Sequence, residues 1–565
     1  MSNMKKLFAM VLAIVMVMSL ATTAFAAGET STLTINTSAN HTYRVYQLLV
    51  GEVSGLTNGS GTLSNITKGA NLNGEIDAFV AAIEGKNGAE LGEIAYSYAT
   101  GDAKYTVVGT GEAVGITVDD GYYVVVDSFT NSNDATDDVL SRYMVAVVGD
   151  TTMTPKTSKP GLDKKIVDTD ANAAIDESDK TDTAAIGDTI EYEITSAVPD
   201  TTGYKYYYYV VHDTMSEGLT LNENSFAVKV GNNTLVKGTD YYVYFNAETN
   251  SFDLAFEDMK KLVDTADNGI SVGSPISIYY TAVVNDKAEI GLDPNTNTAN
   301  LEYSNNPGSS ERKDKEDEPG IPGDGTATGE GPEYITKTYV TELTILKVDN
   351  NGKKLTGAEF TLTGENLNKV IIETNTTFEK VEEGETGEYY KLVNGTYTKT
   401  APSTVAEGEE GYNADLYEST TPEYVRVTTV ITSTAAAGNP KAVTAAVNEE
   451  GYIIFTGLNA GKYTLTETKT PEGYNTIDPI EFTITATQTG STALVGGQIA
   501  WESDNDEIVL DATNGVFDAT IVNMPGSVLP ETGGMGTVIF YALGAVLVLA
   551  AVVLLVTKKR MSVAE

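Results

Sequence analysis

The sequence has 565 residues, no cysteine, two histidines and a formal net charge of −43 at pH 7. The lack of cysteine excludes disulfides and cysteine-based metal sites, and two histidines are too few for a histidine cluster. We therefore expect no metal and no cofactor. The negative charge argues against nucleic acid as a partner, because phosphates require a basic surface. The many Tyr, Thr and Val residues, separated by Gly and Asn, favour an all-β fold.

The amino-terminal segment has the pattern of a secretory signal peptide. Lys5 and Lys6 precede an apolar run over residues 7–20, and small residues at Ala24 and Ala26 form a cleavage site. We expect residues 1–26 to be removed, so that the mature chain begins at Ala27 outside the cytoplasm. The remaining length is sufficient for several domains with real cores.

Strand patterns and breaker residues divide the mature chain into three predicted domains. The first, residues 27–150, is mostly β, with strand-like runs at 32–36, 43–49, 121–126 and 143–148 and helical spacing over 76–83. Residues 151–161 contain Pro155 and Pro160 and are predicted to be a linker.

The second and third predicted domains are β-sandwiches. Strand-like runs of the second, residues 162–307, lie at 162–167, 189–195, 204–211, 225–230, 241–245, 276–284 and 298–303. Residues 308–332 are rich in Gly, Pro and charge, which predicts a linker or an exposed loop. The third domain, 333–525, is long for one sandwich, and we expect residues 365–423 to be an insertion within it.

Three strands of the third domain each carry one polar group on an otherwise apolar face. With a period of two, Lys347 shares a face with Leu343 and Ile345, Glu467 shares one with Tyr463 and Leu465, and Asn523 ends the face of Phe517, Ala519 and Ile521. Such groups are costly to bury unless they meet.

If the three groups do meet, an isopeptide bond can form. Burial favours a neutral lysine and a protonated carboxyl group. The amine of Lys347 can then attack the amide carbon of Asn523, while Glu467 polarises that carbonyl group and helps to expel ammonia. The bond would close a loop of about 177 residues, worth ~5 kcal/mol in the chain-entropy treatment of cross-links. It would replace the missing disulfides.

The segment around Glu467 resembles the E-box of Cna-B type domains, YxLxETxxPxGY, which residues 463–474 match. That family places the bonding Lys on the first strand and the Asn at the end of the last strand, as here. The second domain is similar to the Cna-A-like middle domain of major pilins, in which Asp takes the catalytic role. By that resemblance Lys164 would bond to Asn297 with the help of Asp213. Three rivals remain open for these positions: Lys165, Asn295 and Asn305.

The carboxyl end resembles the cell-wall sorting signal of Gram-positive surface proteins. Leu529, Pro530, Glu531, Thr532 and Gly533 precede an apolar stretch over residues 537–556 and a basic cluster over 558–560. Twenty apolar residues are long enough for a transmembrane helix, and the basic cluster would stay in the cytoplasm. The resemblance implies cleavage between Thr532 and Gly533 by a sortase, which transfers the threonyl group to an amine.

The domain order, the E-box and the sorting signal together resemble a backbone (major) pilin of sortase-assembled pili. In that family a lysine in the linker after the first domain accepts the threonyl group. Lys156 matches this place, although Thr154 stands where the motif usually has an aromatic residue, and Lys159 is the rival. The resemblance implies tandem Ig-like sandwiches of Cna-A and Cna-B type.

The resemblance also implies a location and partners for the chain. The location would be an extracellular pilus anchored to peptidoglycan, and the partners would be sortase, further copies of the chain, accessory pilins and a host surface receptor. The alternative is a monomeric wall-anchored adhesin that binds host matrix and does not need Lys156. We do not expect an enzyme, because no Ser–His–Asp set and no paired carboxylates in a cleft can be identified.

Overall fold

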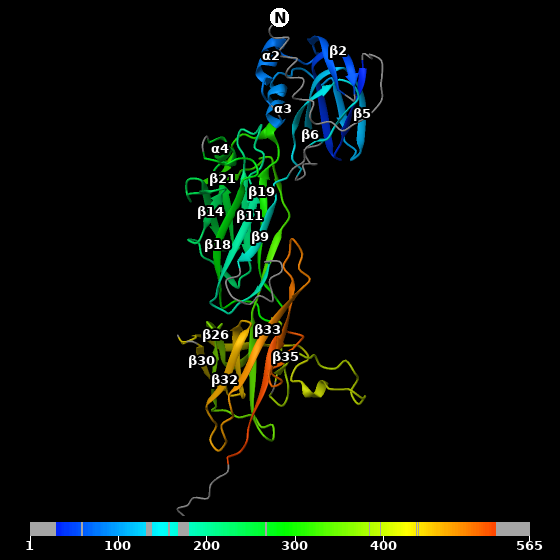
Figure 1. The fold of residues 1–565 in the computed structure, drawn as a ribbon. Helices are drawn as coiled ribbons and strands as arrows, with labels where there is room; N and C mark the ends of the chain where they lie inside the picture. Colours follow the sequence, from blue (N-terminus) through cyan, green and yellow to red (C-terminus); the bar gives the residue numbers. More distant parts are fainter. Residues whose placement is uncertain are drawn as a thin grey trace, which may run out of the picture.

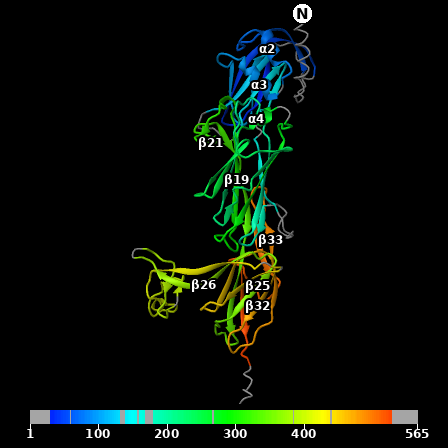
Figure 2. The ribbon, with the colours of Figure 1, turned by 90° about the vertical axis from the view of Figure 1, so that its left-hand side faces the viewer.

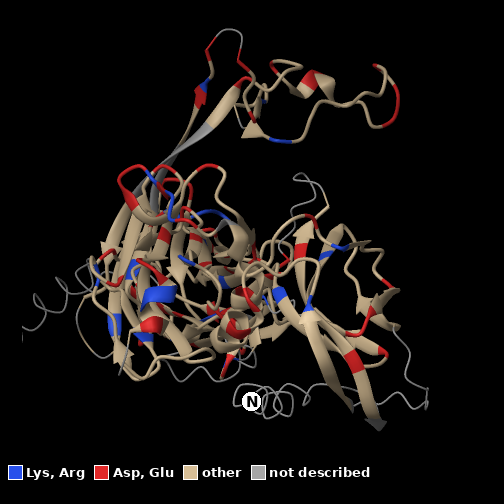
Figure 3. Cartoon of the chain, turned by 90° about the horizontal axis from the view of Figure 1, so that it is seen from above, with Lys and Arg blue, Asp and Glu red and all other residues tan. Residues whose placement is uncertain are grey.

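The computed structural model describes residues 30–57, 60–86, 88–130, 138–155, 159–167, 180–265, 268–382, 385–395, 397–436, 438 and 440–526. Three β domains follow one another in a row, with the amino-terminal domain at one end and the third domain at the other (Figures 1 and 2). The structure thus confirms the mostly-β fold. Seen along this row, the positions of Asp and Glu are scattered over the ribbon rather than gathered in one place (Figure 3).

The first domain has two sheets and two helices. One sheet has the order β5-β1-β8 and the other β3-β2-β6-β7, with β4 beside β2. The strands are β1 (Thr30–Asn36), β2 (His41–Thr57), β3 (Ser60–Lys68), β4 (Tyr105–Val108), β5 (Ala113–Asp119), β6 (Gly121–Phe129), β7 (Arg142–Val147) and β8 (Thr151–Met153). The helical spacing over 76–83 is confirmed as α2 (Ile76–Ile83), which buries Phe79 and Ile83, and α3 (Gly88–Ser97) follows it.

The start of the predicted linker belongs to this first domain. Strand β8 pairs in parallel with β1, with Leu33 opposite Thr151 and Ile35 opposite Met153. Since Met153 is buried in the domain core, the segment that can act as a linker begins after this residue.

The middle domain is a sandwich of two sheets. One has the order β15-β14-β18-β11-β9 with β13 on β18, and the other has the order β10-β23-β19-β12-β17-β16 with β22 on β19. The first sheet contains β9 (Leu162–Val167), β11 (Thr189–Ala197), β13 (Leu219–Leu221), β14 (Ala227–Val230), β15 (Asn233–Thr234) and β18 (Pro275–Val284). The second contains β10 (Thr181–Thr183), β12 (Tyr209–Met215), β16 (Tyr241–Asn246), β17 (Ser251–Phe256), β19 (Asn295–Ser304), β22 (Thr328–Glu330) and β23 (Tyr334–Tyr339). Helix α4 is Met259–Asp264.

The strand predicted over the tyrosine-rich residues 204–211 begins later in the structure. Strand β12 begins at Tyr209, and the residues before it are not in a strand. The rings of Tyr204 and Tyr207 pack edge to face 4.7 Å apart. A pair three positions apart breaks the alternation that a strand from residue 204 would require.

Residues 308–332 are built onto the middle domain, so the domain boundary differs from the prediction. They contain η2 (Pro307–Ser309), a hairpin of β20 (Asp314–Lys315) and β21 (Glu318–Pro322), and strand β22. Ile321 is buried against Val210 and Ala255. Gly320 has φ +84°, and a Cβ atom there would lie 2.6 Å from the carbonyl oxygen of Phe256. The glycine therefore permits a close backbone contact rather than a flexible spacer.

The third domain is also a sandwich, with sheet orders β29-β26-β31-β24-β36-β35 and β30-β25-β32-β33-β34. Its strands are β24 (Thr341–Asp349), β25 (Glu359–Gly364), β26 (Lys369–Lys380), β29 (Tyr424–Thr434), β30 (Lys441–Ala446), β31 (Tyr452–Leu458), β32 (Gly461–Lys469), β33 (Ile480–Thr489), β34 (Gln498–Ser503), β35 (Val509–Asp511) and β36 (Val516–Asn523). The first and last long strands, β24 and β36, pair in parallel, with Lys347 opposite Ile521.

The predicted insertion contains an extension of the third domain. Strands β26 and β29 form a long antiparallel ribbon that leaves the sandwich sideways (Figure 2). The extension at its end contains β27 (Tyr390–Lys391), β28 (Tyr397–Thr398) and η3 (Ala414–Leu416). Among the described residues, the buried core cluster of the third domain contains none from the extension beyond the ribbon.

Several contacts connect the middle and third domains. Strand β23 of the middle domain leads directly into β24 of the third domain. The indole nitrogen of Trp501 donates to the carbonyl oxygen of Gly291 at 3.1 Å, and Asn368 Nδ2 donates to that of Gly187 at 2.9 Å. Among the described residues no helix is long and apolar enough to cross a membrane, and the predicted span over 537–556 lies outside them.

Candidate functional site

The third domain brings together the three polar groups that alternate onto its core face. Lys347 on β24, Glu467 on β32 and Asn523 on β36 are at most 4% exposed. Asn523 Nδ2 donates to both carboxylate oxygens of Glu467, at 2.9 and 3.1 Å. Period-two alternation, with Leu, Ile, Phe and Tyr at the other inward positions, is what turns all three inward.

The Lys347 amine is held in a setting that favours its neutral form. Burial lowers the pKa of Lys347 to about 8, although the neighbouring Glu467 carboxylate acts in the opposite direction. The amine donates to the carbonyl oxygen of Ile521 at 3.0 Å, on the strand that carries Asn523. The Asn523 Oδ1 atom is buried and has no hydrogen-bond partner among the described residues. Among the described residues, no donor therefore forms a hydrogen bond with the carbonyl oxygen of the Asn523 amide.

Glu467 is held in place by contacts on its other side. Its Oε2 atom accepts hydrogen bonds from the backbone N–H of Ile477 at 3.1 Å and from the Thr470 hydroxyl at 3.3 Å. The carbonyl oxygen of Asn475 accepts from Asn523 Nδ2 at 3.0 Å. The loop that follows β32 thus orients both the carboxylate and the amide.

The middle domain brings together a second set of the same kind. Lys164 on β9, Asp213 on β12 and Asn297 on β19 are 0–1% exposed. Lys164 Nζ lies 2.6 Å from Asp213 Oδ2. Burial lowers the pKa of Lys164 to about 8 and raises that of Asp213. These directions favour transfer of the lysine proton to the carboxylate.

The amide of Asn297 is reached through a tyrosine that the sequence analysis missed. Asn297 Nδ2 donates to the Tyr280 hydroxyl at 3.0 Å, and this hydroxyl donates to Asp213 Oδ2 at 2.6 Å. Tyr280 lies on β18 and is fully buried. The alternating pattern of β18 could have predicted that Tyr280 faces the core. The sequence does not show which of the inward-facing tyrosines contacts the amide of Asn297.

The rivals for the middle-domain positions are engaged elsewhere. Lys165 lies on the other face of β9 and pairs with Glu193 at 3.0 Å. Asn295 is buried, but its side chain bonds the backbone of Glu289 and Thr338. Asn305 Nδ2 donates to the carbonyl oxygen of Thr328.

The first domain contains a set of similar composition in a different environment. Lys104 Nζ contacts Gln47 Oε1 at 2.8 Å and Asp119 Oδ2, while Gln47 Nε2 donates to Asp119 Oδ2 at 2.9 Å. The Lys104 and Asp119 side chains are 29% and 44% exposed. The lysine lowers the pKa of Asp119, which is the reverse of the direction found at Asp213. The charged form of the Asp119 carboxyl group is therefore favoured, and this set lacks the burial found around Lys164 and Lys347.

The residues predicted to join subunits lie at the edges of what the structure describes. Lys156 and residues 529–533 are outside the described residues. Lys159 Nζ lies 3.0 Å from Asp138 Oδ1, and its side chain is 43% exposed. In the described part of the chain no group of three or more His, Asp or Glu side chains is arranged to hold a metal ion.

Three family models match the chain. A Gram-positive pilin backbone subunit 2, Cna-B-like domain matches residues 186–307, a prealbumin-like fold domain matches 427–498, and the LPXTG cell wall anchor motif matches 525–562. The model on the middle domain is of Cna-B-like type, whereas the sequence analysis likened this domain to the Cna-A type. A search of curated proteins gave no significant match.

Among solved structures, the chain is similar to several pilins. These include the T6 backbone pilin of serotype M6 Streptococcus pyogenes, with 17% identity, 89% of this chain and 100% of that chain covered and a TM-score of 0.46. The major pilin SpaD of Corynebacterium diphtheriae has 16% identity, 88% and 98% coverage and a TM-score of 0.40. The major pilin BcpA of Bacillus cereus has 14% identity, 88% and 100% coverage and a TM-score of 0.37.

Proposed function

We propose that the chain is a structural subunit of an extracellular, wall-anchored pilus and that it forms a covalent fibre. The matches to a Gram-positive pilin backbone domain and to an LPXTG cell wall anchor motif support this proposal. A sortase would capture Thr532 as an acyl-enzyme and transfer it to Lys156 of the next subunit. The same chemistry on a wall precursor would attach the fibre to peptidoglycan. The partners would be sortase, further copies of the chain and accessory pilins.

The arrangement of the domains supports this head-to-tail linkage. In the sequence, Lys156 and Lys159 stand between the first and middle domains, and the described chain ends in the third domain, before the anchor motif (Figure 1). A donor that follows the third domain and an acceptor that precedes the middle domain would lie at opposite ends of these two domains. Joining them repeatedly would extend the fibre in one direction.

We further propose that Lys347 and Asn523 form an isopeptide bond with the help of Glu467. The ammonium group of Lys347 passes one proton to Glu467, and the neutral amine attacks the amide carbon of Asn523. Glu467 returns this proton to the amide nitrogen as the C–N bond breaks and takes up the second proton of the attacking amine. Ammonia leaves, and the carboxyl group ends protonated. The observation that carries this proposal is the double hydrogen bond from Asn523 Nδ2 to the buried Glu467.

In the middle domain we propose the equivalent bond between Lys164 and Asn297, with Asp213 in the place of the glutamate. Its buried lysine–aspartate contact of 2.6 Å supports the first proton transfer. Each bond forms once within one molecule, so neither would make the chain an enzyme.

The experiment that tests the fibre compares cell-wall extracts of the wild type with a Lys156→Ala variant on a denaturing gel. We expect a ladder of covalent multimers in the wild type and a single monomer band in Lys156→Ala. Lys287→Ala, which removes an exposed lysine of the middle domain, is the matched control and should keep the ladder. A ladder that survives in Lys156→Ala but is lost in Lys159→Ala would move the acceptor. A single band in the wild type would favour the monomeric adhesin instead.

A further inference from the structure

The two buried sets differ in how the carboxyl group reaches the amide. In the third domain Glu467 accepts directly from Asn523 Nδ2 at 2.9 and 3.1 Å. In the middle domain the Tyr280 hydroxyl accepts from Asn297 Nδ2 at 3.0 Å and donates to Asp213 Oδ2 at 2.6 Å. Aspartate is one methylene shorter than glutamate, and the hydroxyl oxygen occupies the place between acid and amide.

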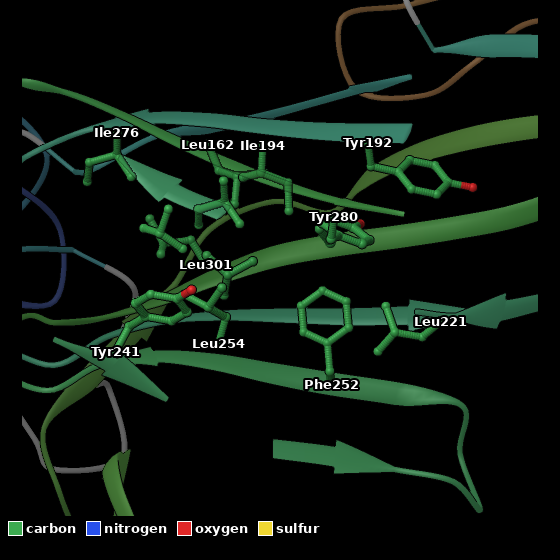
Figure 4. Packing of buried hydrophobic residues seen from close by; sticks show 14 of the residues in the cluster. Leu162, Tyr192, Ile194, Leu221, Tyr241, Phe252, Leu254, Ile276, Tyr280 and Leu301 are labelled. Atoms are coloured by element: carbon green, nitrogen blue, oxygen red, sulfur yellow. The ribbon is translucent and has the colours of Figure 1, made fainter. Parts of the chain in front are cut away.

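Tyr280 is fixed in this place by the rings around it. Its ring stacks on Tyr192 and on Phe226, at 5.2 and 5.5 Å between centroids, and meets Phe252 edge to face at 5.0 Å. Figure 4 shows Tyr280 between Tyr192 and Phe252 in the core of the middle domain. With the ring held from several sides, the hydroxyl oxygen stays within hydrogen-bond distance of both Asp213 Oδ2, to which it donates, and Asn297 Nδ2, from which it accepts.

We propose that Tyr280 is a catalytic residue of the middle-domain site, which passes a proton from Asp213 to the leaving amide nitrogen of Asn297. This rests on the proposed Lys164–Asn297 bond and names a residue for it. The residue touches the reacting amide, so its hydroxyl takes part in the bond exchange itself.

The proton transfers balance. The Lys164 ammonium group gives one proton to Asp213, and the neutral amine attacks the Asn297 amide carbon. As the bond to Nδ2 breaks, Tyr280 gives its proton to that nitrogen and recovers one from Asp213. The attacking nitrogen gives its second proton to Asp213. The products are the new amide, ammonia, an unchanged tyrosine and a protonated aspartate.

The test follows formation of the two bonds by intact mass and peptide mapping during cell-free synthesis of the full chain. Each bond removes ~17 Da as ammonia. Tyr280→Phe keeps the ring but lacks the hydroxyl. We expect the middle-domain bond to form about 100-fold or more slowly, which is the usual range for losing a proton-transfer group. The Lys347–Asn523 bond should form at the normal rate in the same molecule and is the internal reference.

Two further variants separate proton transfer from packing. Tyr209→Phe removes another buried hydroxyl of this core, which pairs with Ser196, and should leave bond formation unchanged. Asp213→Glu added to Tyr280→Phe should restore rapid bond formation, because the longer carboxylate can reach the amide as Glu467 does. If Tyr280 acted only through packing, the longer carboxylate would not restore the rate of bond formation.

Three results would overturn the proposal. One is a Tyr280→Phe protein that forms the middle-domain bond at the wild-type rate. Another is an equal loss in Tyr209→Phe, which would assign the effect to packing. The third is a wild-type protein without the Lys164–Asn297 bond, which would overturn the proposed bond and the role of Tyr280 together.

Discussion

At the scale of single residues, burial separates a reactive lysine from an ordinary ion pair. Lys164 and Lys347 are fully buried and each interacts with a carboxyl group, whereas Lys104 contacts a carboxylate and an amide but is partly exposed. Burial disfavours the charged form of Lys164 and of Lys347, and no such burial surrounds Lys104. If the proposed bonds form, similar groups give two bond-forming sets and one surface contact.

Removing either carboxyl group should abolish one bond and leave the other. The wild-type chain should be ~34 Da lighter than its sequence predicts, which corresponds to two molecules of ammonia. After correction for the substitution, Glu467→Ala and Asp213→Ala should each be only ~17 Da lighter. Intact mass spectrometry measures this. A deficit of three ammonia molecules would contradict our assignment of the Lys104 set as unreactive, and Lys104→Ala is the control.

The depressed pKa of Lys347 should make the unlinked third domain more stable at alkaline pH. In Asn523→Ala no bond forms, and the folded lysine loses its proton near pH 8, whereas the unfolded chain keeps it to about pH 10.5. Between these values the unfolded state binds more protons, so the unfolding free energy rises with pH, by about 3 kcal/mol in total. Calorimetry at pH 7–10.5 tests this. Lys347→Met in the same background should remove the rise.

At the scale of elements, alternation predicted which residues face the core. The period-two patterns around Lys347, Glu467 and Asn523 could be read from the sequence because apolar neighbours mark the buried face. The same holds for Lys164 and Asp213. The Tyr280 contact could not be predicted, because it depends on how two sheets face each other across the core, and a strand pattern does not encode that distance.

For residues 308–332 the prediction of a linker or an exposed loop was wrong. Their Gly and Pro content is typical of a linker, but the glycine and proline residues serve a packed hairpin, in which Tyr244 donates to the carbonyl oxygen of Pro319 at 2.9 Å. Gly and Pro are frequent both in flexible linkers and in tightly packed turns, so composition alone does not distinguish the two. Strand β22 was missed for a similar reason, since Gly329 and the charged Glu330 hide a strand of three residues.

Gly320→Ala should therefore destabilise the middle domain. Its positive φ is unfavourable for alanine, and the new Cβ atom would clash with the carbonyl oxygen of Phe256. We expect a loss of about 1–3 kcal/mol, seen as a lower midpoint of the middle-domain thermal transition. Gly161→Ala is the matched control, because nothing lies within 4 Å of a Cβ atom there. Equal midpoints for both variants would contradict the packed hairpin and would favour a linker over residues 308–332.

At the scale of the whole molecule, the two proposed bonds determine which parts of the chain can extend under load. A force applied between Lys156 and Thr532 would pass through the Lys164–Asn297 and Lys347–Asn523 bonds and bypass the chain between each pair. Only the roughly 50 residues between the two loops could unravel, which is about 170 Å at full extension.

Single-molecule pulling between these two positions should reveal the bypass. Asp213→Ala should release roughly 130 further residues, or about 450 Å, and Glu467→Ala roughly 180, or about 600 Å. The wild type should show neither step. Lys104→Ala should behave like the wild type. Long extension steps in the wild type would mean that the bonds are not formed in the fibre.

The parallel pairing of β24 with β36 also has a consequence for biogenesis. Lys347 and its partner Ile521 lie 174 positions apart, so the pair cannot exist until the last strand of the domain has been delivered. Pairings between distant segments form late in folding. A subunit still crossing the membrane would lack β36 and with it the contact between the amide and Glu467, so the proposed reaction could not begin. The covalent bond would therefore form only in subunits whose export is complete, and it would be irreversible. It would form immediately before the anchor motif at residues 529–533 becomes available for assembly.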